Sequence, residues 1–199
     1  MIGAWVLLGG RAFGKPMIAP KTVMIALGVN TLLAVGGFAL LFIEVSFSAE
    51  ERVLFTHYQY ALAPAPIFIG LLAAIVLLRT PVNDGEPARA ARVALALSLA
   101  LFFSGGFLGI FVDGTDTRTP AHYQGVIGAV NLAVMSFMVL FVLPILERGL
   151  VKWKAIRIAF WLYGLGQLLH SLGLFVAGGY GAPRRVAGTA PNFDEIINL

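Results

Sequence analysis

Residues 121–146 read AHYQGVIGAVNLAVMSFMVLFVLPIL, a stretch without lysine, arginine, aspartate or glutamate. A helix that crosses the hydrocarbon core of a bilayer needs roughly 20 predominantly apolar residues. This stretch is long enough, and its few polar side chains, such as His122 and Asn131, carry no fixed charge. It therefore predicts a transmembrane helix, and it makes an integral membrane protein the first hypothesis for the whole chain.

The composition of the whole chain supports that hypothesis. Of the 199 residues 59% are hydrophobic and only 12% are charged, whereas soluble globular domains average about 25% charged residues. The mean hydropathy is +0.88. We therefore expect an all-α integral membrane protein that forms a single transmembrane domain over residues 1–199. The stretches long enough to span cover residues 23–47, 60–78, 93–112, 122–146 and 156–177.

A further apolar stretch covers residues 2–10, and it is too short to cross a bilayer alone. No lysine or arginine precedes it, so it does not have the pattern of a signal peptide. We expect it to be the end of a helix whose beginning lies on another chain. A partner chain that supplies additional N-terminal helices would then dock at this segment.

Lysine and arginine are distributed unevenly between the two sides of the membrane. One side carries Arg11, Lys15, Lys21, Arg79, Arg89, Arg92, Arg148, Lys152, Lys154 and Arg157. The other side carries Arg52, Arg118, Arg184 and Arg185. Because cytoplasmic loops are enriched in these residues, we expect a multi-pass protein of a bacterial-type plasma membrane, with a cytoplasmic N-terminus and an external C-terminus. The pI of about 9.7 does not indicate nucleic-acid binding, since the cations lie in short loops between apolar spans.

The chain contains no cysteine and only three histidines, His57, His122 and His170. The lack of thiols excludes cysteine-ligated iron–sulfur clusters and the thioether attachment of c-type haem, which leaves histidine as the main candidate ligand for iron. His122 begins the fourth span, and Arg184 and Arg185 follow the fifth, so one crossing and one return place them on the same side. One nitrogen for the iron and two cations for the propionates are what a non-covalent haem requires.

Helical periodicity places His122, Gly125, Ala129, Ala133 and Ser136 on one face of the fourth span. Small side chains at this spacing most often mark close packing between helices, and for this seam taken alone we favour packing. The alternative is a flat macrocycle that lies along the seam while His122 binds its iron. The two interpretations differ in whether neighbouring helices fill the seam.

Three further polar residues are considered, and two of them, His170 and Glu44, are open to two interpretations. His170 lies well inside the fifth span. It is either hydrogen-bonded to Gln167 or to another helix, or it is an axial ligand or part of a proton path. His57 is expected in the first outer loop, where tyrosines flank it at the membrane interface. Glu44 is expected to link helices through hydrogen bonds, with a proton path as the weaker alternative.

Two carboxylates precede the fourth span, Asp113 and Asp116 in the loop VDGTDTRTPAH. They either cap the helix or pair with Arg118, or they lie near haem propionates, where they hold water, a metal or a shared proton. The segment between residues 79 and 92 is rich in proline, glycine and charge. We expect it to be a solvated cytoplasmic loop.

Four stretches resemble the C-terminal half of subunit I of the haem-copper oxidases, the family of cytochrome c oxidases and nitric oxide reductases. In chain order, RVLFTHYQYALAPAPIFIGL, LFFSGGFLGIFVDGTDTRTP, AHYQGVIGAVNLAVMSFMVLFVLPILERG and WLYGLGQLLHSLGLFVAGGYGAPRR resemble the family's eighth to eleventh helices. Residues 1–47 would then match the end of the sixth helix and the seventh. This resemblance implies that His122 binds the high-spin haem and that Arg184 and Arg185 hold its propionates. Asp116 resembles a polar residue near those propionates.

The chain also departs from the family's pattern. The family's tenth helix carries two histidines with one residue between them, whereas Gln124 occupies the second position here, so the ligand of the low-spin haem is missing. The outer end of the first span reads EVSFSAEERVLF and lacks the histidine pair that binds copper. The family's first five helices have no counterpart. The resemblance therefore implies an incomplete oxidase, with no copper expected from this chain alone.

These observations favour a haem-binding membrane subunit of a respiratory electron-transfer complex. The haem would be of b or a type, the partners would be other membrane subunits, and no catalytic residue is assigned. The alternative is a cofactor-free structural or assembly subunit derived from half of an oxidase subunit, which the loss of the second histidine favours. A third interpretation is a transporter with Glu44, Asn131 and His170 as a polar path, although the sequence lacks the inverted halves that transporters show.

Overall fold

The computed structural model describes residues 1–42, 49–81, 85–112, 116–149 and 152–184. Within these ranges the chain is helical and forms no strand, apart from an isolated bridge between Asp116 and Pro183. The expectation of an all-α protein with five candidate spans is confirmed for the described residues. The helical segments long and apolar enough to cross a membrane are Pro20–Ala39, Val53–Arg79, Glu86–Phe111, Arg118–Ile145 and Trp153–Gly179.

We expected a single transmembrane domain. Within the structure the chain divides into two compact units. Unit 1 comprises Met1–Ala96 and Ser136–Trp153, and unit 2 comprises Leu97–Met135 and Lys154–Leu199. Three long helices contribute residues to both units, α5 (Glu86–Leu108), α6 (Arg118–Phe137) and α8 (Trp153–Gly179). The candidate site lies in unit 2, and unit 1 carries a separate groove.

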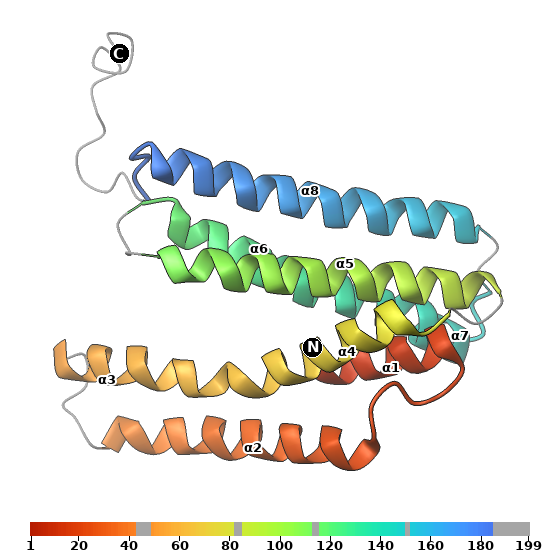
Figure 1. The fold of residues 1–199 in the computed structure, drawn as a ribbon, viewed down its shortest axis with the longest axis horizontal. Coiled ribbons are helices and arrows are strands. Elements are labelled where there is room, and N and C mark those ends of the chain that lie inside the picture. Colours follow the sequence, from red (N-terminus) through yellow and green to blue (C-terminus); the bar gives the residue numbers. More distant parts are fainter. Residues whose placement is uncertain (43–48, 82–84, 113–115, 150–151, 185–199) are drawn as a thin grey trace, which may run out of the picture. The chain divides into compact units, whose positions relative to one another are not determined.

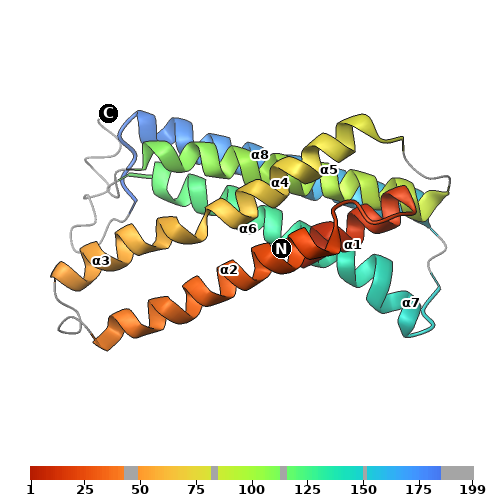
Figure 2. The same ribbon diagram turned by 60° about the horizontal axis from the view of Figure 1, so that its bottom comes forward.

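Unit 1 contains three apolar helices, two of which contact the third (Figure 2). The short helix α1 (Ile2–Phe13) ends at Gly14, whose φ of 68° is left-handed and favours a residue without a side chain. The longer α2 (Pro20–Ala39) begins with a proline, which fits a position where the backbone hydrogen has no helical partner. Both helices contact α4 (Pro64–Arg79). The apolar segment at residues 2–10 is therefore part of a distinct helix packed within unit 1.

The second span begins earlier than the apolar pattern suggested. It starts with α3 (Ala49–Gln59), passes through a 3₁₀ turn at Tyr60–Leu62 and continues as α4. His57 therefore lies exposed in a helix, and its prediction as a loop residue was wrong. The apolar pattern stops at the polar residues, yet alanine, glutamate and arginine are good helix formers, so the helix extends beyond the apolar run.

The third span also begins earlier than predicted. We expected it to start at residue 93, but α5 starts at Glu86 and ends in a 3₁₀ turn at Gly109–Phe111. The segment from Glu86 to Arg92 is thus helical, and the predicted loop extended too far toward the third span. The sequence EPARAARV has glutamate and proline in the first turn, where both are favourable, followed by alanines and arginines.

Arg92 links three helices of unit 1. Its Nη1 donates to the carbonyl oxygen of Thr80 and its Nη2 to that of Leu77, both at 2.9 Å. These carbonyl groups lie at the C-terminal end of α4, where the helix has no partners of its own for them. The guanidinium also lies 5.9 Å from the centroid of the Phe13 ring. Arg92 of α5 therefore caps α4 and contacts α1.

The fourth span contains an irregular turn near its end. After α6 the chain forms a π-helical turn at Met138–Val142 and a final turn α7 (Leu143–Ile145). Pro144 accounts for this irregularity, because proline has no backbone hydrogen to donate and its ring clashes with the carbonyl four residues earlier. The turn lies in unit 1 and carries Phe141.

Unit 2 is built around α5, α6 and α8 (Trp153–Gly179), which run side by side in Figure 1. Small and polar residues allow close approach between them. The hydroxyl of Ser98 donates to the carbonyl of Ala129 at 2.8 Å. Gly164 lies against Leu97, whose Cδ1 would be 3.0 Å from an added Cβ. Close packing of three helices thus forms the frame of the candidate site.

Candidate functional site

His122 lies just after the first turn of α6, which begins at Arg118. Pro120 is in that first turn, where a missing backbone hydrogen costs no helical hydrogen bond. The amide of Ala121 donates to the carbonyl oxygen of Thr117 at 3.0 Å and closes the turn. This local structure holds His122 at the end of unit 2 where α6 begins.

The imidazole of His122 has a defined hydrogen-bond partner. Its Nδ1 lies 2.7 Å from the carbonyl oxygen of Gly105 in α5. A carbonyl oxygen only accepts hydrogen bonds, so Nδ1 must carry the proton. The neutral ring then has its lone pair on Nε2. Histidine ligands of metals are commonly held in this way, with one nitrogen donating to a backbone carbonyl and the other free for the metal.

Gly109 makes room for the same ring. A Cβ added at Gly109 would lie 2.6 Å from Nδ1 of His122 and 2.9 Å from its Cε1. Both distances are shorter than van der Waals contact, so a side chain at this position would displace the imidazole. Gly105 and Gly109 are one helical turn apart. Together they provide a hydrogen-bond acceptor and the space that the ring occupies.

The small-residue seam of α6 is filled by neighbouring helices. A Cβ added at Gly125 would lie 2.6 Å from Cα of Gly105 and 3.3 Å from the hydroxyl oxygen of Ser171. Ala129 and Ala133 are fully buried. The packing interpretation of the seam is therefore confirmed, and a macrocycle does not fit along it. A haem could reach His122 only from another side of the ring.

Asp116 and Arg118 form a close ion pair in the turn before α6. The Nη2 of Arg118 lies 2.6 Å from Oδ2 of Asp116, and its Nε donates to the same oxygen at 2.7 Å. The backbone amide of Arg118 donates to Oδ1 at 2.8 Å. Asp116 is 8% exposed. These contacts show that it both pairs with Arg118 and caps the helix, which was the first of our two interpretations of this residue.

This turn is bonded to the end of α8. The hydroxyl of Thr117 donates to the carbonyl of Leu174 at 2.8 Å, and its amide donates to that of Ala182 at 3.0 Å. Gly178 is required here, because an added Cβ would lie 2.7 Å from the amide nitrogen of Arg118. The segment that leads to Arg184 is therefore held beside the beginning of α6.

Arg184 lies at the same end of unit 2 as His122, as the spacing of the spans predicted. Its guanidinium carbon is 5.8 Å from the centroid of the Tyr123 ring, and Tyr123 directly follows His122. The imidazole and the Tyr123 ring are themselves 5.3 Å apart between centroids. A cation, an aromatic ring and an imidazole with a free nitrogen thus lie together.

Four predicted site residues remain. Glu44, Asp113 and Arg185 lie outside the described residues. His170 is exposed on α8, directly before Ser171, whose hydroxyl donates to the carbonyl of Ala121 at 2.6 Å. Successive residues of a helix point about 100° apart. His170 therefore does not share the direction in which Ser171 contacts α6.

The hydrogen bond that we considered between His170 and Gln167 is not formed. The buried Oε1 of Gln167 has no hydrogen-bond partner among the described residues, and its side chain lies against Gly128. The described part of the chain contains no group of three or more histidine, cysteine, aspartate or glutamate side chains that could hold a metal ion. A haem needs only one or two axial ligands, so the haem hypothesis does not depend on such a group.

Sequence reasoning missed the residues that position His122. Gly105, Gly109 and Thr117 were not assigned any role, and Tyr123 was not connected with the arginines. The run SGGFLG within an otherwise bulky apolar span was an available signal, because glycine in a membrane helix often marks close approach of another group. Which group approaches depends on the register between α5 and α6, which the run itself does not contain.

Comparison with known proteins gives no named relative. No protein-family model matches the chain, and no solved structure matches significantly. An uncharacterized protein of Rickettsia prowazekii (strain Madrid E) is 29% identical over 106 residues, which are 47% of this chain and 20% of that protein. An uncharacterized protein of Aquifex aeolicus (strain VF5) is 39% identical over 59 residues, 29% of this chain and 15% of that protein. The matches thus span a fifth or less of these relatives.

Proposed function

We propose that this chain is a haem-binding membrane subunit of a respiratory electron-transfer complex, related to the C-terminal half of subunit I of the haem-copper oxidases. His122 would provide the axial nitrogen for the iron. The observation that carries the proposal is the hydrogen bond between Nδ1 of His122 and the carbonyl oxygen of Gly105. When the ring is neutral, this hydrogen bond places the lone pair on Nε2, the nitrogen that would then bind the iron.

The arginine next to this imidazole supports the same proposal. Arg184 is exposed, and among the described residues no carboxylate forms an ion pair with it. Arg118, in contrast, is already paired with Asp116. Arg184 is therefore available for an anionic group that approaches His122, and haem propionates have that charge. Arg185, the next residue in the sequence, would provide a second cation.

A haem bound here would supply one-electron chemistry at its iron. The residues of this chain would orient it through His122 and set its midpoint potential through the nearby positive charge. Reduction of oxygen or nitric oxide would require copper ligands that this sequence lacks, so those reactions are assigned to the complex and not to this chain. Its partners would be other membrane subunits.

The proposal includes a location and an orientation. The chain would be a multi-pass protein of a bacterial-type plasma membrane with a cytoplasmic N-terminus. The beginning of α6 and the end of α8 would then face the outside. A cysteine introduced at Tyr180, which is 91% exposed, should react with a membrane-impermeant thiol reagent in intact cells. Labelling only after cell disruption would contradict this orientation.

An absorption spectrum tests haem binding directly. The chain purified with its partners should show a Soret band and an α band in the reduced-minus-oxidised difference spectrum. His122→Ala should remove the band that belongs to this haem. His57→Ala is the matched control, because His57 is exposed on α3 in unit 1, and it should leave the spectrum unchanged. A colourless preparation with the partners still attached would contradict the proposal.

The single histidine of α8, His170, would determine the spin state of the haem. Because His170 is exposed and lies outside the cluster around His122, we expect His170→Ala to retain the band. Loss of the band in both single variants would instead indicate a haem with two histidine ligands. Such a haem is low-spin and does not leave the iron a free position for oxygen.

A cofactor-free structural subunit is the second candidate. The tight contact between Gly125 and Gly105 favours it, because the small-residue seam is used for helix packing. In that case His122 would serve only to join α5 and α6 through its hydrogen bond. The same spectrum separates the two candidates, since His122→Ala would then lower the thermal stability of a colourless protein.

A further inference from the structure

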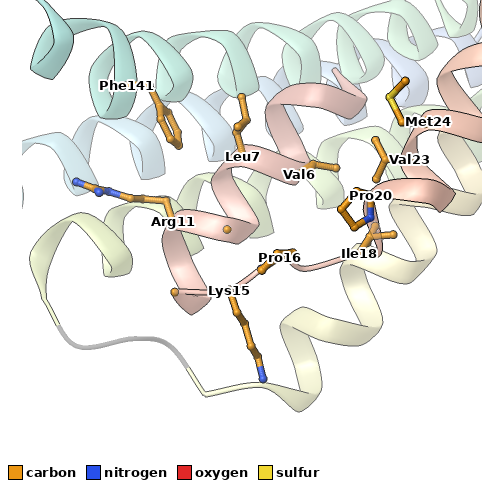
Figure 3. Close-up of a pocket in the computed structure, with 12 residues that line it drawn as sticks. Val6, Leu7, Arg11, Lys15, Pro16, Ile18, Pro20, Val23, Met24 and Phe141 are labelled. Carbon is orange, nitrogen blue, oxygen red and sulfur yellow. The ribbon is translucent and has the colours of Figure 1, made fainter.

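Unit 1 contains an apolar groove at the turn between α1 and α2, with a cavity volume of about 620 Å³ (Figure 3). Leu7 of α1, Val23 and Met24 of α2, and Phe141 of the π-helical turn are among the side chains that line it. Val23 is buried, whereas Met24 is 68% exposed. The groove is therefore open along part of its length and apolar inside.

Two cations lie at this groove, Arg11 and Lys15, and no other charged residue in the described part of the chain lines it. Arg11 is in the last turn of α1 and Lys15 is in the loop that follows. No described carboxylate forms an ion pair with either one. The first acidic residue of the sequence is Glu44. The groove thus has an apolar interior and a positively charged edge.

Stabilisation of α1 explains only part of this arrangement. A cation in the last turn of a helix interacts favourably with the helix dipole, which accounts for Arg11. Lys15 lies beyond the helix and obtains no such benefit. In addition, α2 begins beside the groove at Pro20, and no side chain caps its first turn. Its positive dipole end adds to the charge of Arg11 and Lys15.

We propose that this groove binds an anionic phospholipid. An acyl chain would occupy the apolar interior, and the headgroup phosphate would lie at the positively charged edge, where the side chains of Arg11 and Lys15 extend in different directions (Figure 3). In a bilayer the phosphate lies directly outside the hydrocarbon region, and here the apolar lining is directly followed by two cations. Basic pockets between transmembrane helices bind anionic headgroups in this way. This lipid site is independent of the proposed haem.

The volume and the charge of the groove favour an anionic lipid over a partner helix or a free phosphate ion. A cavity of about 620 Å³ lies within the range of about 300–1,000 Å³ that is typical of small-molecule sites. A partner helix would bury Arg11 and Lys15, and that arrangement is costly without paired acids. A free phosphate ion would leave the apolar interior exposed. An anionic lipid satisfies both parts of the groove.

The test uses the full-length protein in nanodiscs of phosphatidylcholine that contain a minor fraction of phosphatidylglycerol. After transfer into detergent, native mass spectrometry measures which lipid is retained. We expect the wild-type protein to retain phosphatidylglycerol in preference to phosphatidylcholine. Arg11→Gln and Lys15→Gln should each weaken this preference about fivefold. Lys21→Gln is the matched control, because Lys21 does not line the groove, and it should retain the wild-type preference.

A second pair of variants tests the apolar part of the site. Gly10 lines the groove, and an added Cβ there would meet no atom within 4 Å. Gly10→Trp should fill the groove and abolish the retention of phosphatidylglycerol. Gly3→Trp is the control, since Gly3 is equally open on α1 but does not line the groove. Circular dichroism verifies that each variant is folded. If Gly10→Trp does not fold, Arg11→Gln and Lys15→Gln test the lipid site on their own.

Three results would overturn the proposal. The first is equal retention of the two lipids by the wild-type protein. The second is the same loss of preference in Lys21→Gln as in the groove variants, which would indicate unspecific attraction. The third is crosslinking of a cysteine introduced at Leu7, 45% exposed on α1, to another polypeptide in native membranes. That result would identify the occupant as a protein helix.

Discussion

The Nδ1 atom of His122 lies 2.7 Å from the carbonyl oxygen of Gly105, and this contact determines which nitrogen of the ring is free. The carbonyl cannot donate, so the proton belongs to Nδ1 and the lone pair to Nε2. The imidazole is also confined by Gly109, where an added Cβ would lie 2.6 Å from Nδ1. A ring whose tautomer and position are both held by backbone atoms is prepared to bind a metal before the metal arrives.

The first prediction concerns Gly109. The substitution Gly109→Ala should displace the imidazole and reduce the haem band of the purified complex at least about tenfold, because ligands that lose their supporting contacts bind metals about 10–100-fold more weakly. Gly106→Ala is the control, since an added Cβ there meets nothing within 4 Å. Absorption spectra of equal amounts of protein measure both. An unchanged band in Gly109→Ala would mean that His122 does not bind the haem.

The contact between α5 and α6 gives the second prediction. An added Cβ at Gly105 would lie 2.6 Å from the backbone nitrogen of Val126, so the two helices would have to separate. Overpacking of this kind typically costs about 1–3 kcal/mol. Gly105→Ala should therefore lower the midpoint of thermal unfolding in detergent, whereas Gly106→Ala should leave it unchanged or raise it slightly. Similar midpoints in the two variants would contradict the close approach.

The third prediction concerns the charge of Arg184. Substitution by glutamine would remove a cation near the proposed haem and disfavour the additional electron, so the midpoint potential should fall. Redox titration monitored at the α band measures it. Lys154→Gln is the matched control, because Lys154 lies at the opposite end of α8 and is exposed. An equal potential in Arg184→Gln and the wild type would mean that this side chain does not interact with the haem.

Arg92 provides a prediction for unit 1. Arg92→Ala removes two hydrogen bonds to the end of α4 and the contact with Phe13, and it should destabilise the protein by about 1–3 kcal/mol. The control is Arg89→Ala. Arg89 lies 3.7 Å from Glu86, and both side chains are substantially exposed, so its removal should change stability by less than about 1 kcal/mol. Thermal unfolding monitored by circular dichroism compares them.

Hydropathy located the spans well but not their ends. The apolar runs at residues 122–146 and 156–177 agree closely with the observed Arg118–Ile145 and Trp153–Gly179. The polar segments before the second and third spans were predicted as loops, yet the part that directly precedes each span is helical. A span is recognised by its apolar side chains, whereas a helix requires only backbone hydrogen bonds and suitable propensity. The two boundaries therefore differ wherever good polar helix formers adjoin an apolar run.

The candidate site, like the spans, was predictable in part. His122 and Arg184 were expected at one end, because two consecutive spans joined by a short loop must return to the side on which they began. The structure places both near Tyr123. The expectations for Glu44, Asp113 and Arg185 lie outside the described residues and stay predictions.

The sequence by itself determined that this chain has five apolar segments long enough to cross a membrane, since length and hydrophobicity are properties of each segment alone. It also determined which end of the fourth span carries a histidine. Only the tertiary structure decided that the carbonyl oxygen of Gly105 accepts a hydrogen bond from that histidine and that Gly109 makes room for its ring. It also decided that Arg11 and Lys15 line one groove. Each of these contacts depends on the rotation and register of one helix against another, and those are set by the packing of many side chains together.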